Sequence, residues 1–371
     1  MDFGISLLPD VGPERKSAVA YYQDALALSR AADEFGLSYV KMTEHYLHPY
    51  GGYCPAPLTF LASVAAQTAQ IRLMTGGVIP NYHHPIQLAS QVTMVDALSD
   101  GRLDVGFARG YLPYEYRAFG IPLDSSHDRF QASITAMIKL WTQEQVTEHT
   151  PYFSFSGATI LPRPTQSPHP PLWAAAVRTL RSFEWIGQMG FGLLMTPTLT
   201  VKSDLRQQID IYRKAFLAAH GQSGRRPRVA ISVPLVVAHT DAEAFRTGDA
   251  LMSEYLRVWL DAADSWSLAW SKDYAAYTGM SHFLRQMSPT SWREAGSAVV
   301  GSVGRVIEQI HELRELADPE VVLWQVDFGG ASRELSEQNL RMFCHHVQPK
   351  LADLCPDRSD PPSGLQEAHH G

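Results

Sequence analysis

The sequence predicts a single (β/α)8 barrel, an α/β fold in which eight parallel strands alternate with helices. Eight short apolar segments alternate with longer segments of helical periodicity, and no long linker separates them. Strands separated by helices pair in parallel through right-handed crossovers, and eight such units close naturally into a barrel. A six-stranded doubly wound sheet with a small second domain is the competing interpretation, but no Gly-x-Gly-x-x-Gly turn follows any predicted strand.

The predicted strands are short apolar runs, and they fall at residues 3–8, 38–43, 71–79, 102–107, 172–177, 192–195, 228–238 and 321–328. The segments between them carry helical periodicity, and the first of these ends at Gly36, a residue type common at helix C-termini. The helices are predicted at residues 17–35, 58–69, 85–98, 129–141, 180–189, 201–220, 242–261, 303–316 and 334–347.

Three segments depart from this repeat. Residues 150–164 have alternating phenylalanines and a Ser-Gly turn, which predicts a β-hairpin inserted before the fifth strand. Residues 262–298 are rich in Trp, Tyr, Ser and Met without a single period, which is typical of a mobile loop or an active-site lid. Residues 352–371 are rich in Pro, Ser, Asp and His and are predicted to form a disordered tail. One barrel domain over residues 1–351 is therefore expected.

The composition argues against several classes of function. The formal net charge is −7, and no segment is basic enough to follow a phosphate backbone, so nucleic-acid binding is not expected. No run of about 18 apolar residues is present, and the first ten residues lack the basic start and cleavage site of a secretory signal. Cys54, Cys344 and Cys355 are widely spaced, which favours a reducing cytoplasm and indicates neither a disulfide framework nor a metal site.

Polar residues follow several predicted strands, and the carboxyl ends of barrel strands form the functional face of this fold. Arg109 follows the fourth strand, and Arg178, Thr179, Arg181 and Ser182 follow the fifth, where a helix begins. Helix N-terminal amides combined with hydroxyls and arginines form a good site for a dianion. The alternative is that Thr179 only caps the helix and that the arginines are surface charges.

His45 follows the second strand and is the candidate for proton transfer, because an imidazole titrates near neutral pH. A histidine at such a position is more often a hydrogen-bonded structural residue. Glu44 could orient His45, or it could be a capping or salt-bridging carboxylate. Gly76 and Gly77 lie late in the third strand, where glycine permits close approach of a flat ring or forms a barrel corner.

An aromatic group in the second half of the chain could line a pocket for an apolar or aromatic substrate. Its members are Tyr255, Trp259, Trp266, Trp270, Tyr274 and Tyr277. The first two lie at helical spacing, which is typical of core packing. The others fall in the irregular segment, where a role in a pocket is more plausible.

Taken in order, the motifs at residues 44–46, 76–80, 99–110, 327–330 and 339–343 resemble those of bacterial luciferase and its flavin-dependent monooxygenase relatives. Each motif is short, but their order and spacing together are specific. The similarity extends over about residues 1–351.

The resemblance implies a barrel that binds reduced FMN from a separate NAD(P)H:flavin reductase and uses dioxygen to oxygenate a small organic substrate. Carried over by position, Arg109, Thr179 and Ser182 would hold the FMN phosphate, with Arg129 as a further candidate. Arg181, beside them at the start of the same predicted helix, is expected to contribute to phosphate binding. His45 would match the catalytic histidine. Gly76 and Gly77 would match a non-prolyl cis peptide beneath the isoalloxazine, and residues 262–298 would match the lid. A homodimer formed through the second and third helices is the family expectation.

Two positions depart from the luciferase pattern. Ala108 stands where luciferase has a reactive cysteine, so light emission is not expected. Arg178 stands where luciferase has a glutamate near the phosphate, which would strengthen binding of a dianion.

Three other functions stay open at this stage. A deazaflavin-dependent hydride-transfer oxidoreductase shares this barrel class and would not consume oxygen. A non-catalytic flavin-binding protein would show no turnover. A non-catalytic partner subunit is disfavoured because His45 and the phosphate-binding residues are retained.

Overall fold

The computed structural model describes residues 1–197, 200, 202–277 and 279–354. Within them, eight parallel strands close into a barrel in the order β1-β2-β3-β4-β7-β8-β9-β11, and β11 returns to β1. Each strand overlaps a predicted segment, with β1 beginning one residue earlier than predicted, so the barrel prediction is confirmed. The barrel strands are β1 (Asp2–Leu7), β2 (Tyr39–Met42), β3 (Arg72–Thr75), β4 (Leu103–Phe107), β7 (Leu172–Ala175), β8 (Gly192–Met195), β9 (Val229–Ala238) and β11 (Val321–Gln325).

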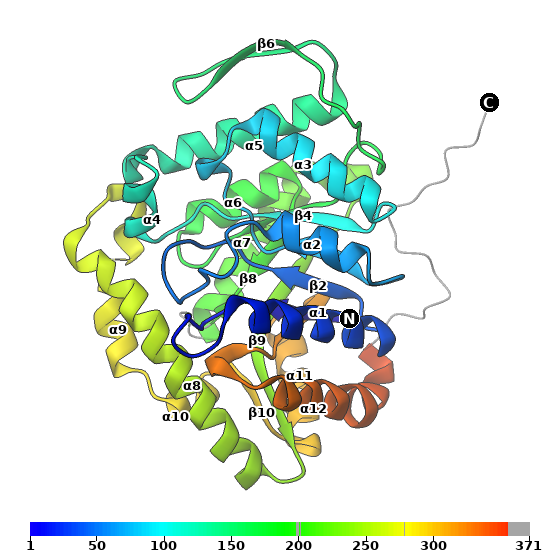
Figure 1. Cartoon of the computed structure of the whole chain (residues 1–371), viewed down its shortest axis with the longest axis vertical. Coiled ribbons are helices and arrows are strands. Elements are labelled where there is room, and N and C mark those ends of the chain that lie inside the picture. Colours follow the sequence, from blue (N-terminus) through cyan, green and yellow to red (C-terminus); the bar gives the residue numbers. More distant parts are fainter. Residues whose placement is uncertain (198–199, 201, 278, 355–371) are drawn as a thin grey trace.

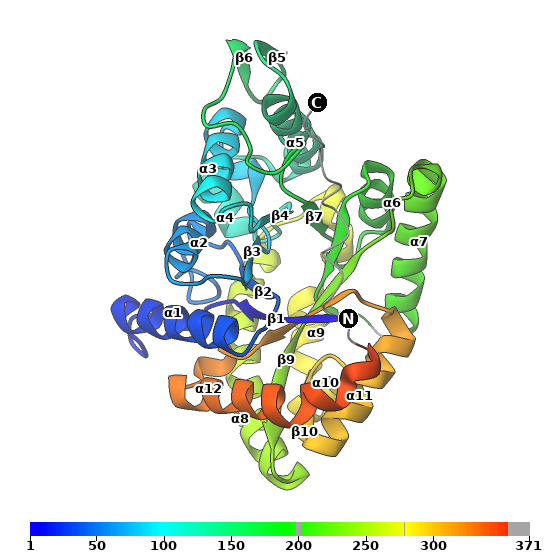
Figure 2. The same ribbon diagram turned by 90° about the vertical axis from the view of Figure 1, so that its right-hand side faces the viewer.

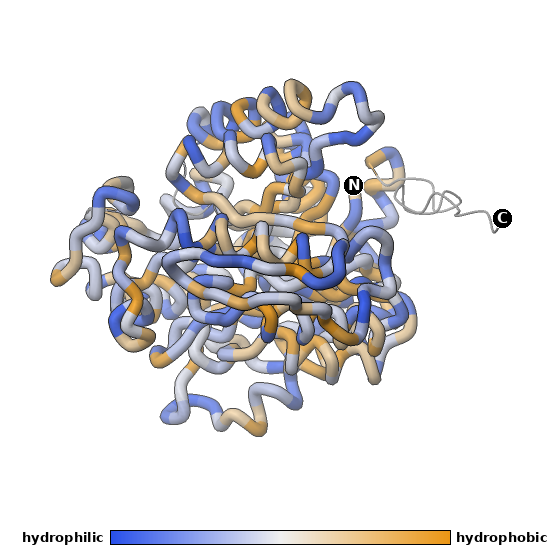
Figure 3. Tube along the Cα trace, turned by 90° about the horizontal axis from the view of Figure 1, so that it is seen from above, coloured by the Kyte–Doolittle hydropathy of each residue, from blue (hydrophilic) through white to orange (hydrophobic). Residues whose placement is uncertain are grey.

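Helices surround the barrel strands (Figures 1 and 2). The covering helices are α1 (Ala18–Glu34), α2 (Pro57–Ala65), α3 (Pro85–Leu98), α5 (Ser126–Thr142), α6 (Leu180–Met189), α7 (Lys202–His220), α11 (Val303–Ala317) and α12 (Arg333–Met342). Hydrophobic and hydrophilic residues alternate along the helices at the edge of the molecule (Figure 3), as expected for helices with one buried face. No described helix has the length and apolarity needed to span a bilayer.

Alternation along the strands separates the residues outside the barrel from those inside it. Phe3, Ile5 and Leu7 of β1 belong to the large core between strands and helices. Because successive strand residues point to opposite faces, Ser6 of β1 points into the barrel. The barrel therefore receives its own interior set of side chains, and their chemistry decides what the interior can bind.

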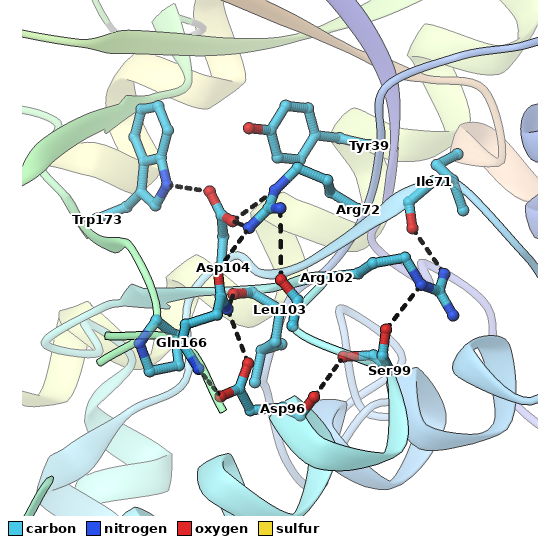
Figure 4. Close-up of polar contacts among 12 residues, drawn as sticks. Tyr39, Ile71, Arg72, Asp96, Ser99, Arg102, Leu103, Asp104, Gln166 and Trp173 are labelled. Atoms are coloured by element: carbon cyan, nitrogen blue, oxygen red, sulfur yellow. Dashed lines mark hydrogen bonds and ion pairs between the residues drawn. The ribbon is translucent and has the colours of Figure 1, made fainter. Parts of the chain in front are cut away.

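A polar network closes the amino end of the barrel (Figure 4). Asp104 of β4 is fully buried and accepts hydrogen bonds from Arg72 Nε at 2.9 Å and Trp173 Nε1 at 2.8 Å. The Arg228 guanidinium lies 4.3 Å from the centre of the Trp173 ring and donates to the Tyr39 hydroxyl at 3.3 Å. Bonded side chains fill this end, and the cavity described below opens at the other.

The inserted hairpin is present and consists of β5 (Val146–His149) and β6 (Ser154–Ala158). It projects from the body at the top of Figures 1 and 2. The predicted position of its turn was wrong. The chain reverses after Thr150, whose hydroxyl accepts hydrogen bonds from the backbone nitrogens of Tyr152 and Phe153 at 3.1 Å each. Gly157, part of the predicted Ser-Gly turn, instead lies in β6 beside a register shift.

The segment predicted as an irregular lid is built of short helices after α8 (Asp241–Ala263). They are η5 (Asp264–Leu268), η6 (Lys272–Tyr277), α9 (Met280–Gln286) and α10 (Pro289–Glu294). A second hydrophobic cluster, which includes Trp266, Tyr274 and Trp292, joins them to α8. The segment is followed by β10 (Val299–Ser302), which the sequence did not predict and which pairs with the end of β9.

The C-terminal boundary differs slightly from the prediction. Helix η9 (Gln348–Leu354) continues past the expected end of the domain at residue 351. The rest of the predicted tail, residues 355–371, lies outside the described residues.

Candidate active site

A cavity opens at the carboxyl ends of the barrel strands, and Tyr274 and Tyr277 of η6 form part of its lining. It encloses about 1380 Å³ of space, its open mouth included. Most of the predicted site residues line it, namely Glu44, His45, Gly76, Gly77, Arg109, Arg178, Thr179 and Ser182. The cavity therefore brings together side chains from β2, β3, β4 and β7, as expected for the functional face of a barrel.

His45 is buried at the cavity wall and is held by a carboxylate that the sequence analysis missed. Its Nδ1 lies 3.0 Å from Glu115 Oε1, on the short helix α4 (Pro113–Ala118). The same oxygen accepts a hydrogen bond from the backbone nitrogen of Tyr46 at 2.8 Å. Because Glu115 occupies Nδ1, the second ring nitrogen of His45, Nε2, is left to serve the cavity.

Glu44 does not orient His45, contrary to one of the two predicted roles. Neighbouring residues in extended chain point in opposite directions. The Glu44 carboxylate is fully buried and accepts hydrogen bonds from the backbone nitrogen of Ile79 at 2.7 Å, from His83 Nε2 at 2.8 Å and from the Tyr46 hydroxyl. These contacts fix the loop after β3, which is the alternative structural role.

Gly76 and Gly77 are joined by the expected cis peptide bond. Their lack of side chains is a steric requirement. A Cβ on Gly77 would lie 2.5 Å from the carbonyl carbon of Phe107, and a Cβ on Gly76 would lie 2.2 Å from Cδ of Lys41. Bare backbone therefore forms this part of the cavity wall, which suits close contact with a flat ring.

The N-terminus of α6 forms the polar end of the cavity. Thr179 is the N-cap residue, but its side chain makes no capping hydrogen bond, so its hydroxyl is available to a ligand. Ser182 and Arg178 line the cavity beside it. Helix amides, two hydroxyls and a guanidinium together form a site suited to a phosphate dianion.

Arg109 reaches this region from β4 and also contacts η6. Its guanidinium lies 4.1 Å from the centre of the Tyr274 ring, and Nη2 donates to the carbonyl oxygen of Asp273 at 3.2 Å. Both residues belong to η6, so the candidate phosphate anchor is in direct contact with the segment predicted to be a lid.

Two predicted arginines do not line the cavity. Arg129 donates from Nε to the carbonyl oxygen of Asn81 at 2.9 Å, which ties α5 to the loop after β3. Arg181 is exposed on α6.

The sequence analysis missed His127, which does line the cavity. Burial lowers the pKa of His127, and the charges of Arg181 and Arg109 lower it further.

Aromatic rings form the remaining wall around His45. Tyr50 and Trp259 stack with ring centres 6.0 Å apart, and Tyr111 and Tyr277 stack at 5.6 Å. Trp259 Nε1 donates to the Tyr111 hydroxyl at 3.0 Å, which links the two pairs.

The predicted aromatic group divides in the structure. Tyr255, Trp259, Tyr274 and Tyr277 line the cavity. Trp266 packs behind them in the second hydrophobic cluster, and Trp270 is 70% exposed.

Comparison with known proteins identifies the class to which this fold and cavity belong. The model of the luciferase-like monooxygenase family matches residues 1–319. The chain belongs to this family of monooxygenases.

Individual relatives support that assignment. The oxygenase component of the flavin-dependent trigonelline monooxygenase of Acinetobacter baylyi is 26% identical over 342 residues, covering 91% of this chain and 92% of the relative. The structure of the monooxygenase RslO1 of Streptomyces bottropensis has a TM-score of 0.80 at 34% identity and covers 95% of this chain and 100% of that one. The coenzyme F420-dependent tetrahydromethanopterin reductase of Methanopyrus kandleri has a TM-score of 0.68 at 18% identity, with coverage of 94% and 99%, which is a likeness of fold alone.

Proposed function

We propose that this chain is the FMN-dependent oxygenase of a two-component system, which receives reduced FMN from a separate NAD(P)H:flavin reductase and oxygenates a small organic substrate with dioxygen. One observation carries the proposal. A bare glycine wall, a phosphate-type helix terminus and a carboxylate-bound histidine line the same cavity. The relatedness to a flavin-dependent oxygenase component supports it.

The residues fit FMN on two independent counts. The Gly76–Gly77 wall of the cavity carries no side chain that would hold a planar ring away from the backbone. At the other end, Arg109, Thr179 and Ser182 would hold the phosphate, and Arg178 would add positive charge. Reduced FMN, when bound, would supply the electrons that activate dioxygen.

The protein's own part in the reaction is to position the cofactor and substrate, to move a proton and to exclude water. His45 would hold or transfer a proton at Nε2, while Glu115 fixes its ring through Nδ1. Helix η6 would keep the cavity dry, because its Tyr274 and Tyr277 close over Arg109 and Tyr111.

The substrate is proposed to be apolar and at least partly aromatic. The rings around His45 offer flat surfaces, and their polar atoms already bond to one another, as in the contact between Trp259 and Tyr111. A planar substrate would stack on such a wall, whereas a strongly polar one would find few free partners there.

Turnover with a flavin reductase tests the function. The protein, FMN, NADH, reductase and a panel of aromatic compounds are combined, and oxygen uptake, peroxide release and oxygenated product are measured. Product formation with oxygen uptake is expected, and the His45→Ala variant should release more peroxide and less product. Hydride transfer to or from F420 without oxygen uptake would replace the proposal with the deazaflavin alternative. Binding of FMN without any turnover would indicate a non-catalytic flavin protein or partner subunit.

The phosphate site has a test of its own. Arg109→Ala should weaken binding of FMN but not of riboflavin, which lacks the phosphate. Arg181→Ala is the matched control, because it removes an arginine of α6, the helix whose N-terminus lines the site, but Arg181 itself does not line the cavity. Equal loss of FMN and riboflavin binding in Arg109→Ala would contradict the assignment.

A homodimer through α2 and α3 is also proposed. Met94 and Leu98 of α3 are 50% and 59% exposed, which gives this helix an apolar outer surface. Light scattering on the purified protein tests it, and a monomer at micromolar concentration would contradict it.

A further inference from the structure

Three polar side chains stand side by side inside the barrel, and the proposed function does not use them. Ser6 of β1 pairs in register with Lys41 of β2 on one side and with Gln325 of β11 on the other. The three are 2%, 6% and 4% exposed, and all line the cavity. We refer to Ser6, Lys41 and Gln325 as the polar shelf.

The donors of the polar shelf are mostly unused. The Lys41 ammonium makes one hydrogen bond among the described residues, to the carbonyl oxygen of Gly76 at 3.3 Å, and no carboxylate pairs with it. The side-chain nitrogen of Gln325 is buried and makes no hydrogen bond of good geometry, although it lies close enough to the Tyr255 hydroxyl to interact with it. Buried donors in folded proteins are nearly always bonded, so a cluster with unused donor capacity facing a cavity indicates a ligand that brings acceptors.

Lys41 keeps a positive charge in this setting. Burial lowers its pKa to about 8, and the charge of Asp327 acts in the opposite direction. Asp327 is engaged by the Tyr21 hydroxyl at 3.0 Å and does not pair with Lys41. The shelf thus presents an ammonium in surroundings of low polarity, where an electrostatic interaction is stronger than in water.

The shelf adjoins the wall against which the flavin ring is proposed to rest. The Lys41 stem runs so close to Gly76 that a Cβ there would lie 2.2 Å from Cδ. A ring in contact with the Gly76–Gly77 segment would therefore lie beside the Lys41 ammonium.

We propose that the polar shelf binds the oxygen- and nitrogen-bearing edge of the flavin and that Lys41 makes the site prefer the anionic reduced form over the neutral oxidised form. This inference rests on the proposed function. A cation beside the pyrimidine part of a flavin stabilises the negative charge that the ring gains on reduction. In an enzyme that takes up reduced FMN from another protein, such a preference would favour loading of the useful form and release of the oxidised one.

The test compares the affinities of the two forms of FMN. The full-length protein is titrated aerobically with oxidised FMN and anaerobically with dithionite-reduced FMN, and the ratio of the two Kd values is determined. Lys41→Met, which removes the charge and keeps the length of the side chain, should lower the preference for reduced FMN about tenfold, which equals about 30 mV in the two-electron potential of bound FMN. Lys41→Arg should retain most of the preference.

Thr43→Val is the matched control. The Thr43 hydroxyl donates to the same carbonyl oxygen of Gly76 at 3.1 Å, but it carries no charge. This variant should change both Kd values by a similar factor and leave their ratio unchanged. Circular dichroism and thermal unfolding verify that each variant is folded, and Lys41→Gln replaces Lys41→Met if that variant is not.

The outcomes separate the inference from the proposed function. If the wild-type protein binds neither form of FMN, the proposed function fails and the inference fails with it. If the wild type binds FMN but Lys41→Met keeps the wild-type ratio, the inference alone is overturned. A change of ratio in Thr43→Val equal to that in Lys41→Met would also overturn it, because the contact with Gly76 would then be responsible and not the charge.

Discussion

The contact between His45 and Glu115 leads to a prediction that separates the effect of the negative charge from the effect of the hydrogen bonds. Glu115 Oε1 accepts from both His45 Nδ1 at 3.0 Å and the Tyr46 backbone nitrogen at 2.8 Å. In Glu115→Gln, the amide oxygen can keep both contacts while the negative charge is lost. In Glu115→Ala, both donors lose their acceptor, and the Tyr82 hydroxyl loses its longer contact with Oε2 at 3.4 Å. The two substitutions should therefore differ strongly in stability and less in activity.

The magnitudes follow from the bonds involved. A buried donor without an acceptor costs about 1–3 kcal/mol, so Glu115→Ala should lose roughly 2–6 kcal/mol of unfolding free energy. Glu115→Gln should lose less than about 1 kcal/mol, because the weakening of two charge-assisted bonds is offset by the removal of a buried charge. Loss of the charge weakens the interaction between residue 115 and a protonated His45 by about 1–2 kcal/mol. This corresponds to a decrease of roughly 5–30-fold in the rate of a step that places a proton on His45.

The assay combines thermal unfolding with turnover in the reductase-coupled reaction. Glu115→Gln should unfold near the wild-type temperature, form product roughly 5–30-fold more slowly and release a larger share of peroxide, with little change in KM. Wild-type product yield in Glu115→Gln would refute the idea that the carboxylate positions and stabilises His45. Equal stability of Glu115→Gln and Glu115→Ala would refute the hydrogen-bond argument.

Three further predictions address the surroundings of the site. Gly77→Ala should abolish FMN binding, because its added Cβ would meet the backbone of β4. Gly76→Ala should weaken FMN binding less, because its added Cβ would meet the flexible Lys41 side chain. Equal effects of the two substitutions in FMN titrations would count against this reasoning. Asp104→Asn should cost about 3–5 kcal/mol in unfolding free energy yet leave kcat of the folded enzyme unchanged, because the network in Figure 4 lies at the opposite end of the barrel. Burial, together with the charge of Asp327, raises the pKa of Asp10 to about 7, so the folded protein holds a proton that the unfolded chain releases above about pH 4. Stability from this group is therefore full below about pH 4 and is lost as the pH rises through about 7, and Asp10→Asn should flatten that decline in thermal unfolding measured across the range. An unchanged slope in Asp10→Asn would assign the decline to other groups.

The barrel could be predicted from the sequence because its signals are local and repeated. Each barrel strand is a buried apolar run, and each covering helix shows its own periodicity, so an error in one element does not alter the pattern. The missed strand β10 (Val299–Ser302) lacks this advantage. It has four residues, follows the lid helices and pairs only with the extension of β9, which places it outside the repeat. The hairpin turn was misplaced because a threonine hydroxyl, and not the glycine, supplies the bonds at the reversal.

The candidate site could be predicted only in part, because two of its components depend on contacts that local patterns do not contain. Glu115 lies 70 positions from His45 and on a helix of six residues, so neither spacing nor strand position connects them. Glu44, adjacent in sequence, was one predicted partner of His45, but its carboxylate bonds to Ile79 and His83 instead.

Lys41 and Gln325 could not be predicted as site residues for a different reason. Both lie in strands that are buried on both faces, where no alternation of polar and apolar residues marks which side chains point inward. In such strands a polar residue is itself the signal, since burial of an unpaired donor is costly and needs a compensating partner. Ser6, Lys41 and Gln325 interrupt three apolar runs at positions that the barrel brings into register. The strand register places these three residues side by side, so that together they form one candidate binding surface. None of the three residues indicates such a surface by itself.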